Sequence, residues 1–208
     1  MSNKVITLID YGMGNIWSVK NAFNYLDCKT EITNDPNQII KADTLVLPGV
    51  GSYRNAMIQL QKHNLDQAIT EAVTSKGVNI LGICLGMQLM GNSGTEDGIT
   101  KGLGFISNSV EIFNSNEIQG NKIPHIGFNE IDIQPNSKLF KNFTNKADFY
   151  FVHSYRMLQE KMNADFATCT YGVKFLAAFG VDNIFATQFH PEKSQSNGLK
   201  LLENFIKL

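Results

Sequence analysis

Short apolar runs alternate with amphipathic segments along the first half of the chain. The runs predict strands at residues 4–10, 29–33, 43–47 and 77–83. Between them, apolar residues recur at helical spacing around residues 16–26, after Pro36 and over residues 53–75. Asn15 or Ser18 could cap the first of these helices, and Asp35 before Pro36 has the pattern of a cap for the second. This alternation predicts a parallel sheet covered on both faces.

The second half of the chain consists of short apolar runs separated by tight turns. They predict strands at residues 105–113, 129–133, 149–152, 166–170, 174–180 and 184–189, with an amphipathic helix at 198–208. The longest loop-like stretch covers residues 91–102, and no linker rich in Pro, Gly or Ser separates the halves. We therefore expect one α/β domain over residues 1–208. Its open mixed, mainly parallel sheet would carry helices on both faces plus an antiparallel layer.

The composition narrows the classes of protein that fit. A formal charge of -1 over 208 residues gives no electrostatic case for nucleic acid or an anionic membrane. No apolar run approaches the roughly 20 residues of a membrane span, and we expect no signal peptide. The cysteines, Cys28, Cys84 and Cys169, are odd in number and far apart, which favours reduced thiols in the cytoplasm over a disulfide framework. No two have metal-ligand spacing, so we expect no metal and no cofactor.

The segment Gly-Ile-Cys-Leu-Gly at residues 82–86 lies between a predicted strand and a predicted helix start. A strand, a sharp turn and a helix form the setting of a nucleophile elbow, and glycines on both sides let the chain turn tightly. The start of the helix would favour a thiolate at Cys84. The plain alternative is a buried thiol that packs as a small apolar side chain.

A cysteine nucleophile needs a base and a group that orients the base. His190 follows the apolar strand at 184–189, and Pro191 and Glu192 follow it. The proline would end the strand and present both side chains at its carboxyl end, where catalytic groups of open α/β sheets gather. Cys84, His190 and Glu192 are thus a candidate triad. Equally, His190 could be a structural residue and Glu192 a surface carboxylate, while His63 lies in a charged segment and is expected in solvent.

Six segments together carry a resemblance. They are Asp-Tyr-Gly-Met-Gly-Asn at 10–15, Pro-Gly-Val-Gly-Ser at 48–52, Gly-Ile-Cys-Leu-Gly-Met-Gln at 82–88, Pro-His-Ile-Gly-Phe-Asn at 124–129, Tyr-Phe-Val-His-Ser-Tyr at 150–155 and Gln-Phe-His-Pro-Glu-Lys-Ser at 188–194. In this order they resemble the class I (triad) glutamine amidotransferases. Within that family they are most similar to the glutaminase subunits of imidazole glycerol phosphate synthase. The resemblance extends from the first predicted strand to the last and implies the family's flavodoxin-like fold.

The resemblance implies hydrolysis of L-glutamine to glutamate and ammonia. Cys84 would attack the carboxamide, His190 would serve as acid and base, and Glu192 would orient His190. The backbone N–H of Leu85 would be one oxyanion donor. The N–H of Val50 would be the second after a peptide flip, although from the residues alone its segment is an ordinary glycine-rich turn.

The family pattern also assigns the head group of glutamine. Gln88 and Glu96 would bind its α-amino group, and Asp97 could exchange roles with Glu96. The backbone around His153, Ser154 and Tyr155 would bind its carboxylate.

In the resembled family the ammonia passes to a (β/α)8 cyclase subunit in a heterodimer. The residues expected on the partner's side are Tyr11, Asn15, His125, Phe128 and Asn129. Phe128 departs from the tryptophan expected there, and Tyr53 stands where phenylalanine is common. These departures leave two pathways open, histidine biosynthesis and amidino-sugar synthesis for surface polysaccharides.

Three other functions compete with this interpretation. The segments at 48–51 and 124–129 speak against a glutaminase of anthranilate or folate-related synthases. The intact candidate triad speaks against a non-enzymatic binding subunit. A hydrolase of γ-glutamyl peptides would work without a partner, whereas the family resemblance predicts weak activity for the chain alone.

Overall fold

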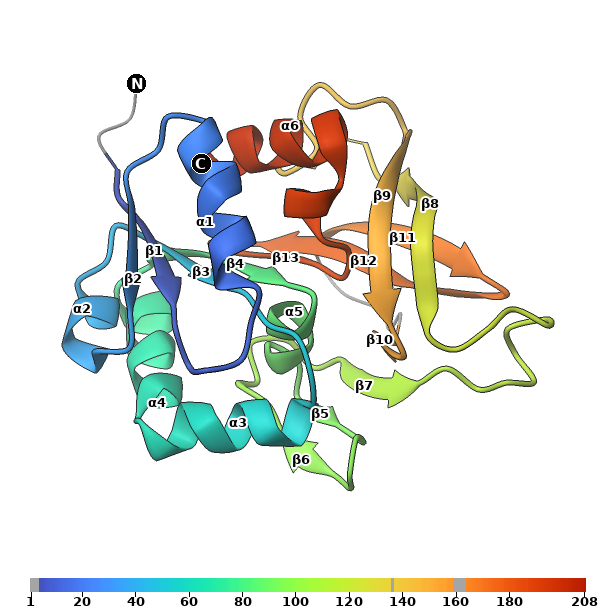
Figure 1. Cartoon of the computed structure of the whole chain (residues 1–208), viewed down its shortest axis with the longest axis horizontal. Coiled ribbons are helices and arrows are strands. Elements are labelled where there is room, and N and C mark those ends of the chain that lie inside the picture. Colours follow the sequence, from blue (N-terminus) through green and yellow to red (C-terminus); the bar gives the residue numbers. More distant parts are fainter. Residues whose placement is uncertain (1–3, 136, 159–163) are drawn as a thin grey trace.

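The computed structural model describes residues 4–135, 137–158 and 164–208. Its centre is a nine-stranded mixed sheet (Figure 1). One half is parallel, in the order β2 (Thr30–Thr33), β1 (Ile6–Ile9), β3 (Thr44–Leu47), β4 (Asn79–Ile83) and β13 (Ile184–Thr187). The other half continues from β13 with antiparallel pairs, in the order β12 (Val173–Val181), β11 (Asp165–Tyr171), β8 (His125–Ile133) and β9 (Lys146–His153).

A second, four-stranded sheet lies beside the main one. It comprises β10 (Tyr155–Met157), β7 (Ser109–Ile112), β5 (Ser93–Gly94) and β6 (Thr100–Lys101). The predicted fold class, a mixed α/β sheet with an antiparallel part, is confirmed. Most of the antiparallel part extends the main sheet edge to edge, because β12 pairs directly with β13.

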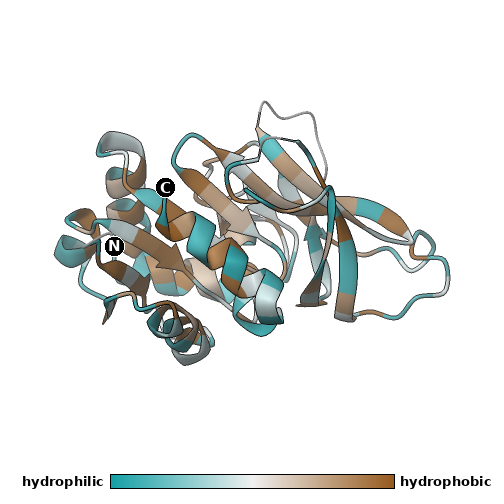
Figure 2. Ribbon diagram, turned by 90° about the horizontal axis from the view of Figure 1, so that it is seen from above, coloured by the Kyte–Doolittle hydropathy of each residue, from teal (hydrophilic) through white to brown (hydrophobic). Residues whose placement is uncertain are grey.

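Helices cover both faces of the parallel half (Figure 1). One face carries α1 (Ile16–Tyr25) and α6 (Gln195–Ile206), and the other carries α2 (Pro36–Ile40), α3 (Tyr53–Lys62), α4 (Leu65–Thr70) and α5 (Leu85–Leu89). Each face has its own buried apolar cluster. Figure 2 shows hydrophobic residues along the central strands, and α6 alternates between hydrophobic and hydrophilic positions as an amphipathic helix does.

The prediction of one long helix over residues 53–75 is wrong. His63 ends α3, and Asn64 has a positive φ of 54°, so the chain turns before α4 begins. Asparagine tolerates this left-handed conformation better than most residues, which explains why the helix breaks here. A π-helical turn, η1 (Glu71–Ser75), then follows α4 directly.

Helix capping agrees with the sequence in one case and differs in the other. Asp35 caps α2 as predicted, since its side chain accepts a hydrogen bond of 2.9 Å from the Asn37 N–H. Asn15 occupies the N-cap position of α1, as predicted, but its side chain makes no capping hydrogen bond. Instead the Ser18 hydroxyl donates to the Asn15 side-chain oxygen at 2.8 Å. This bond uses the oxygen that a cap would have offered to the backbone.

Several boundaries also differ from the sequence expectations. The expected loop at 91–102 contains β5 and β6, β8 begins earlier than predicted, and β10 was not expected. Among the described residues, no helix is both long and apolar enough to cross a bilayer. For the site, the decisive pairing is β4 with β13, because Ile83 lies beside Thr187 in parallel register. The residues that follow these strands therefore emerge at the same edge of the sheet.

Candidate active site

Cys84 occupies a strained turn between β4 and α5. Its φ of 54° and ψ of -107° are rare for a residue with a side chain. A Cβ on Gly82 would lie 2.8 Å from the Gly86 backbone, and a Cβ on Gly86 would collide with the Leu47 carbonyl oxygen. Both glycines are therefore required by close approach of the backbone. The turn has the geometry of a nucleophile elbow.

His190 and Glu192 lie at the end of the neighbouring strand β13. The His190 backbone N–H donates to the Tyr150 carbonyl at 2.9 Å, and the 3₁₀ turn η2 (Pro191–Lys193) carries Glu192. His190 Nδ1 and Glu192 Oε1 are 2.8 Å apart, and both side chains are almost fully buried. Because the carboxylate accepts, Nδ1 carries a hydrogen. Nε2 has no hydrogen-bond partner among the described residues.

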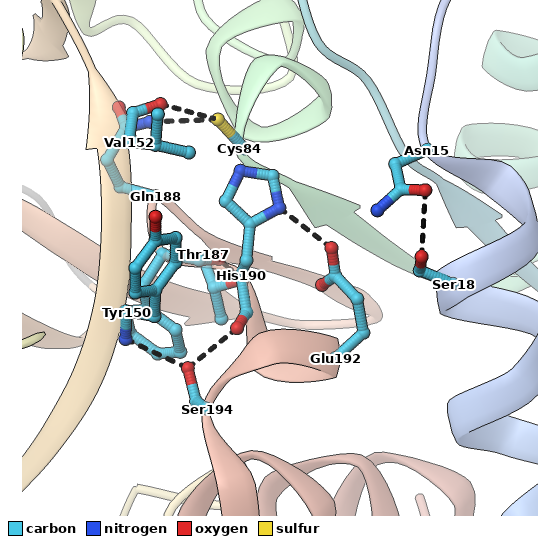
Figure 3. A network of polar contacts seen from close by, with 11 residues as sticks. Asn15, Ser18, Cys84, Tyr150, Val152, Thr187, Gln188, His190, Glu192 and Ser194 are labelled. Atoms are coloured by element: carbon cyan, nitrogen blue, oxygen red, sulfur yellow. Dashed lines mark hydrogen bonds and ion pairs between the residues drawn. The ribbon is translucent and has the colours of Figure 1, made fainter. Parts of the chain in front are cut away.

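The imidazole of His190 lies between the Cys84 thiol and the Glu192 carboxylate (Figure 3). Burial lowers the pKa of His190, but its interactions with Cys84 and Glu192 together outweigh burial and raise the pKa to about 10. The raised pKa favours the charged imidazolium form of His190. The arrangement brings the three predicted triad side chains together.

A cavity of about 430 Å³ opens beside the thiol. It is lined by every residue predicted for the oxyanion hole and for glutamine binding: Val50, Leu85, Gln88, Glu96, His153, Ser154 and Tyr155. Glu96 lines the cavity and also accepts a hydrogen bond of 2.6 Å from the Tyr53 N–H, whereas Asp97 accepts one from Ser52 at 3.3 Å. Glu96 is thus the acidic residue that faces the cavity. Among the described residues, no three His, Cys, Asp or Glu side chains gather as a metal site.

The predicted oxyanion donor of Leu85 is already occupied in this structure. Its N–H donates to the Gly49 carbonyl at 3.3 Å. The segment at 48–51 therefore presents a carbonyl oxygen, an acceptor, toward the elbow. The Tyr11 hydroxyl donates to the Pro48 carbonyl at 2.9 Å, and this buried hydrogen bond restrains the segment.

The comparisons with known proteins agree with this geometry. The family model described as "Glutamine amidotransferase class-I" matches residues 7–208. The chain belongs to the class-I glutamine amidotransferase family.

Two relatives match this class-I glutamine amidotransferase over nearly its full length. "Imidazole glycerol phosphate synthase subunit HisH 1" of Campylobacter jejuni (strain RM1221) is 48% identical over 98% of this chain and 100% of the relative. "Imidazole glycerol phosphate synthase subunit HisH 2" of Methanococcus maripaludis is 44% identical over 98% of this chain and 99% of the relative. The solved structure of PurLQS from Thermotoga maritima has a TM-score of 0.74 at 15% identity, covering 98% of both chains, and supports the fold.

Of the residues predicted to face a partner in this amidotransferase, some lie at the surface and others are buried beneath it. Phe128 on β8 is 51% exposed, and Asn15 and Asn129 are half-buried. Tyr11 and His125 are buried, at 3% and 2% exposed, so their side chains lie beneath this surface. Tyr11 contacts Pro48, and His125 contacts His153, which lines the cavity.

Gln188 is a site residue that the sequence analysis did not single out. It is fully buried, and its side-chain nitrogen lies 3.7 Å from the Cys84 sulfur (Figure 3). Ser194 was also missed, and its hydroxyl joins the His190 carbonyl to the Tyr150 N–H. The available signal for Gln188 was a lone amide within an otherwise apolar strand, since a buried polar group needs a partner.

Proposed function

We propose that this chain is the glutaminase subunit of an imidazole glycerol phosphate synthase. It hydrolyses L-glutamine to glutamate and ammonia, which a (β/α)8 cyclase subunit uses in histidine biosynthesis. The observation that carries the proposal is the cavity that joins Cys84 to Gln88, Glu96 and residues 153–155. The names of relatives at 48% and 44% identity support the choice within the family.

In the proposed reaction, the Cys84 thiolate attacks the side-chain carbonyl carbon of glutamine. The imidazolium of His190 protonates the departing ammonia, leaving a γ-glutamyl thioester on Cys84. His190 then takes a proton from water, which attacks the thioester and releases glutamate. The hydrogen bond of 2.8 Å from His190 to Glu192 supports an orienting role for that carboxylate.

The tetrahedral intermediate needs donors for its oxyanion, and we propose Leu85 and Val50. The Leu85 N–H is bound to the Gly49 carbonyl at 3.3 Å, so it is not available to a substrate. Rotation of the peptide between Gly49 and Val50 would withdraw the carbonyl and direct the Val50 N–H toward the hole. Removing one such donor typically costs about 10²–10³-fold in rate, so the blocked form is expected to be nearly inactive.

The polar groups at the other side of the cavity fit an amino-acid head group. We assign the α-ammonium to Gln88 and Glu96, whose oxygens accept hydrogen bonds. The α-carboxylate would bind the backbone around His153, Ser154 and Tyr155. Each of these residues lines the cavity that contains the thiol.

We further propose that the exposed face of β8 docks the cyclase subunit to form a heterodimer. Ile126 and Phe128 are 59% and 51% exposed on adjacent outward positions of this strand. Two large apolar side chains on one strand face are a liability unless a partner covers them. We regard residues 1–208 as a single glutamine amidotransferase domain, and the unbridged Cys28, Cys84 and Cys169 support a cytoplasmic setting.

Replacing the nucleophile in the reconstituted heterodimer tests the function. Cys84→Ala is expected to reduce glutamine-dependent ring synthesis at least about 10³-fold, because no thioester can form. Synthesis from added ammonium should remain, and Cys28→Ser should retain both activities. Loss of both activities in a folded Cys84→Ala complex would contradict the division of labour between subunits.

Amidino-sugar synthesis is the alternative pathway, and Phe128 is the observation that favours it. This exposed residue replaces the tryptophan expected at the partner surface. Pairing the chain separately with a histidine-pathway cyclase and with a sugar-pathway homologue would decide between them. Glutamine-dependent turnover only with the sugar-pathway subunit would overturn our choice.

A further inference from the structure

Gln188 connects the nucleophile to the residue that we assign to the head group of glutamine. It follows β13, two residues before His190, and its side chain is fully buried. Its Nε2 lies 3.7 Å from the Cys84 sulfur, and its Oε1 lies 2.9 Å from Gln88 Nε2. One amide therefore contacts both ends of the site.

The orientation of both amides follows from the Tyr155 carbonyl. A backbone carbonyl only accepts, so the Gln88 group 3.0 Å from it must be the NH₂ nitrogen. That nitrogen donates its second hydrogen to Gln188, so the atom of Gln188 that faces Gln88 must be its oxygen. The NH₂ of Gln188 is then left to face Cys84. No alternative orientation of either side chain satisfies all three contacts.

This network also determines what Gln88 can offer a ligand. Both hydrogens of its NH₂ group are committed, to Tyr155 and to Gln188. Among the described residues, no hydrogen bond uses the Oε1 of Gln88, so this oxygen can accept from a ligand in the cavity that the residue lines. Gln88 thus acts as an acceptor, which suits an ammonium group and not a carboxylate.

We propose that Gln188 is a positioning residue that donates a hydrogen bond to the Cys84 sulfur and fixes Gln88 as an acceptor. Figure 3 shows the amide approaching the sulfur from the side opposite to the chain of His190 and Glu192. A charged sulfur gains more from this N–H than a neutral thiol does. The assignment of the head group rests on the proposed function, whereas the contact with the sulfur does not.

The test separates these two contributions in the full-length chain. The rate at which iodoacetamide alkylates Cys84 is followed against pH by mass spectrometry of the Cys84 peptide. The KM for glutamine is measured in the complex with the cyclase. The variants are Gln188→Met, which removes both hydrogen bonds at similar volume, and Gln88→Met, which leaves the nitrogen of Gln188 beside the sulfur. Asn204→Leu is the control, because it removes a buried amide that binds Leu139 and Lys141 far from the thiol.

In Gln188→Met, the midpoint of the alkylation profile is expected to rise by about one pH unit, a roughly tenfold lower rate below the midpoint. Gln88→Met and Asn204→Leu should keep the wild-type midpoint. The KM for glutamine should rise about tenfold in both glutamine variants and stay unchanged in Asn204→Leu. The titratable groups that face Cys84 are intact in every variant: His190, Tyr11 and, lining the same cavity, Glu96, His153 and Tyr155.

A wild-type midpoint in folded Gln188→Met would overturn the proposal. If that variant does not fold, Gln188→Asn decides, because it keeps a buried amide but withdraws it from the sulfur by one methylene. It should show the same rise, and an unchanged midpoint would again contradict us. The alkylation result needs neither glutamine nor a partner. Absent glutamine turnover in the wild-type complex would therefore refute the proposed function alone.

Discussion

At the scale of single residues, hydrogen bonds fix the state of two buried histidines beside the cavity. His153 Nδ1 lies 2.8 Å from the Tyr155 carbonyl and must donate, so its Nε2 accepts from His125 Nδ1 at 3.1 Å. His125 Nε2 then accepts from Asn129 at 3.4 Å. Burial lowers the pKa of His125 to about 4 and that of His153 to about 3. Both rings are neutral at physiological pH.

These lowered pKa values predict instability in mild acid. In the unfolded chain both histidines titrate near 6.5, so the unfolded state binds more protons than the folded state below that pH. Stability is therefore complete above about pH 6.5 and falls as the pH drops toward 4. The expected loss is on the order of 2 kcal/mol per histidine between pH 6.5 and 5.

Urea unfolding at a series of pH values measures this loss. His153→Gln should flatten the profile, whereas the exposed His63 offers a control, and His63→Gln should keep the wild-type slope. An equal slope in His153→Gln and wild type would show that other groups cause the acid instability.

At the scale of elements, the segment 48–51 is the part of the site whose conformation, on our proposal, decides activity. The Tyr11 hydroxyl bonds to the Pro48 carbonyl, and a Cβ on Gly49 would collide with that hydroxyl. Tyr11 therefore supports the conformation in which the Gly49 carbonyl occupies the Leu85 N–H. The segment and Tyr11 act together as one element.

Removing the Tyr11 hydroxyl should ease the rotation of this segment. A buried hydrogen bond contributes about 1 kcal/mol, so Tyr11→Phe is expected to raise glutamine hydrolysis by the chain alone about fivefold. Tyr25 is exposed on α1, and Tyr25→Phe is the matched control with unchanged activity. Steady-state glutamate release measures both. Unchanged or lower activity in folded Tyr11→Phe would exclude this role.

The sequence patterns predicted strands and helices more accurately than the points at which those elements break. The strands β4 and β13 and the elbow at Cys84 could be predicted, because buried runs and required glycines leave a direct mark on the sequence. The break at Asn64 could not, since one residue in a left-handed conformation does not disturb the helical spacing around it. The occupied Leu85 N–H was also beyond prediction, because peptide orientation at a glycine is not encoded by any side chain.

At the scale of the whole molecule, the sheet places the nucleophile and its base at the same end of two neighbouring strands. The proposed oxyanion donor of Leu85, by contrast, is occupied by the Gly49 carbonyl. Cys84 and His190 follow the paired strands β4 and β13, so the fold itself brings them together. The proposed hole depends on the segment after β3, which is held by the buried Tyr11–Pro48 hydrogen bond and by the bond from Leu85 to Gly49. The exposed Ile126 and Phe128 lie on the face where we expect the partner.

The central claim is that the catalytic residues are assembled while the hole completes only in the heterodimer. The direct measurement is kcat for glutamine hydrolysis by the chain alone and by the chain with a (β/α)8 cyclase and its nucleotide substrate. Because one missing oxyanion donor costs about 10²–10³-fold, we predict that kcat rises at least about 100-fold in the complex. An isolated chain that already hydrolyses glutamine at the rate of the complex would contradict the account.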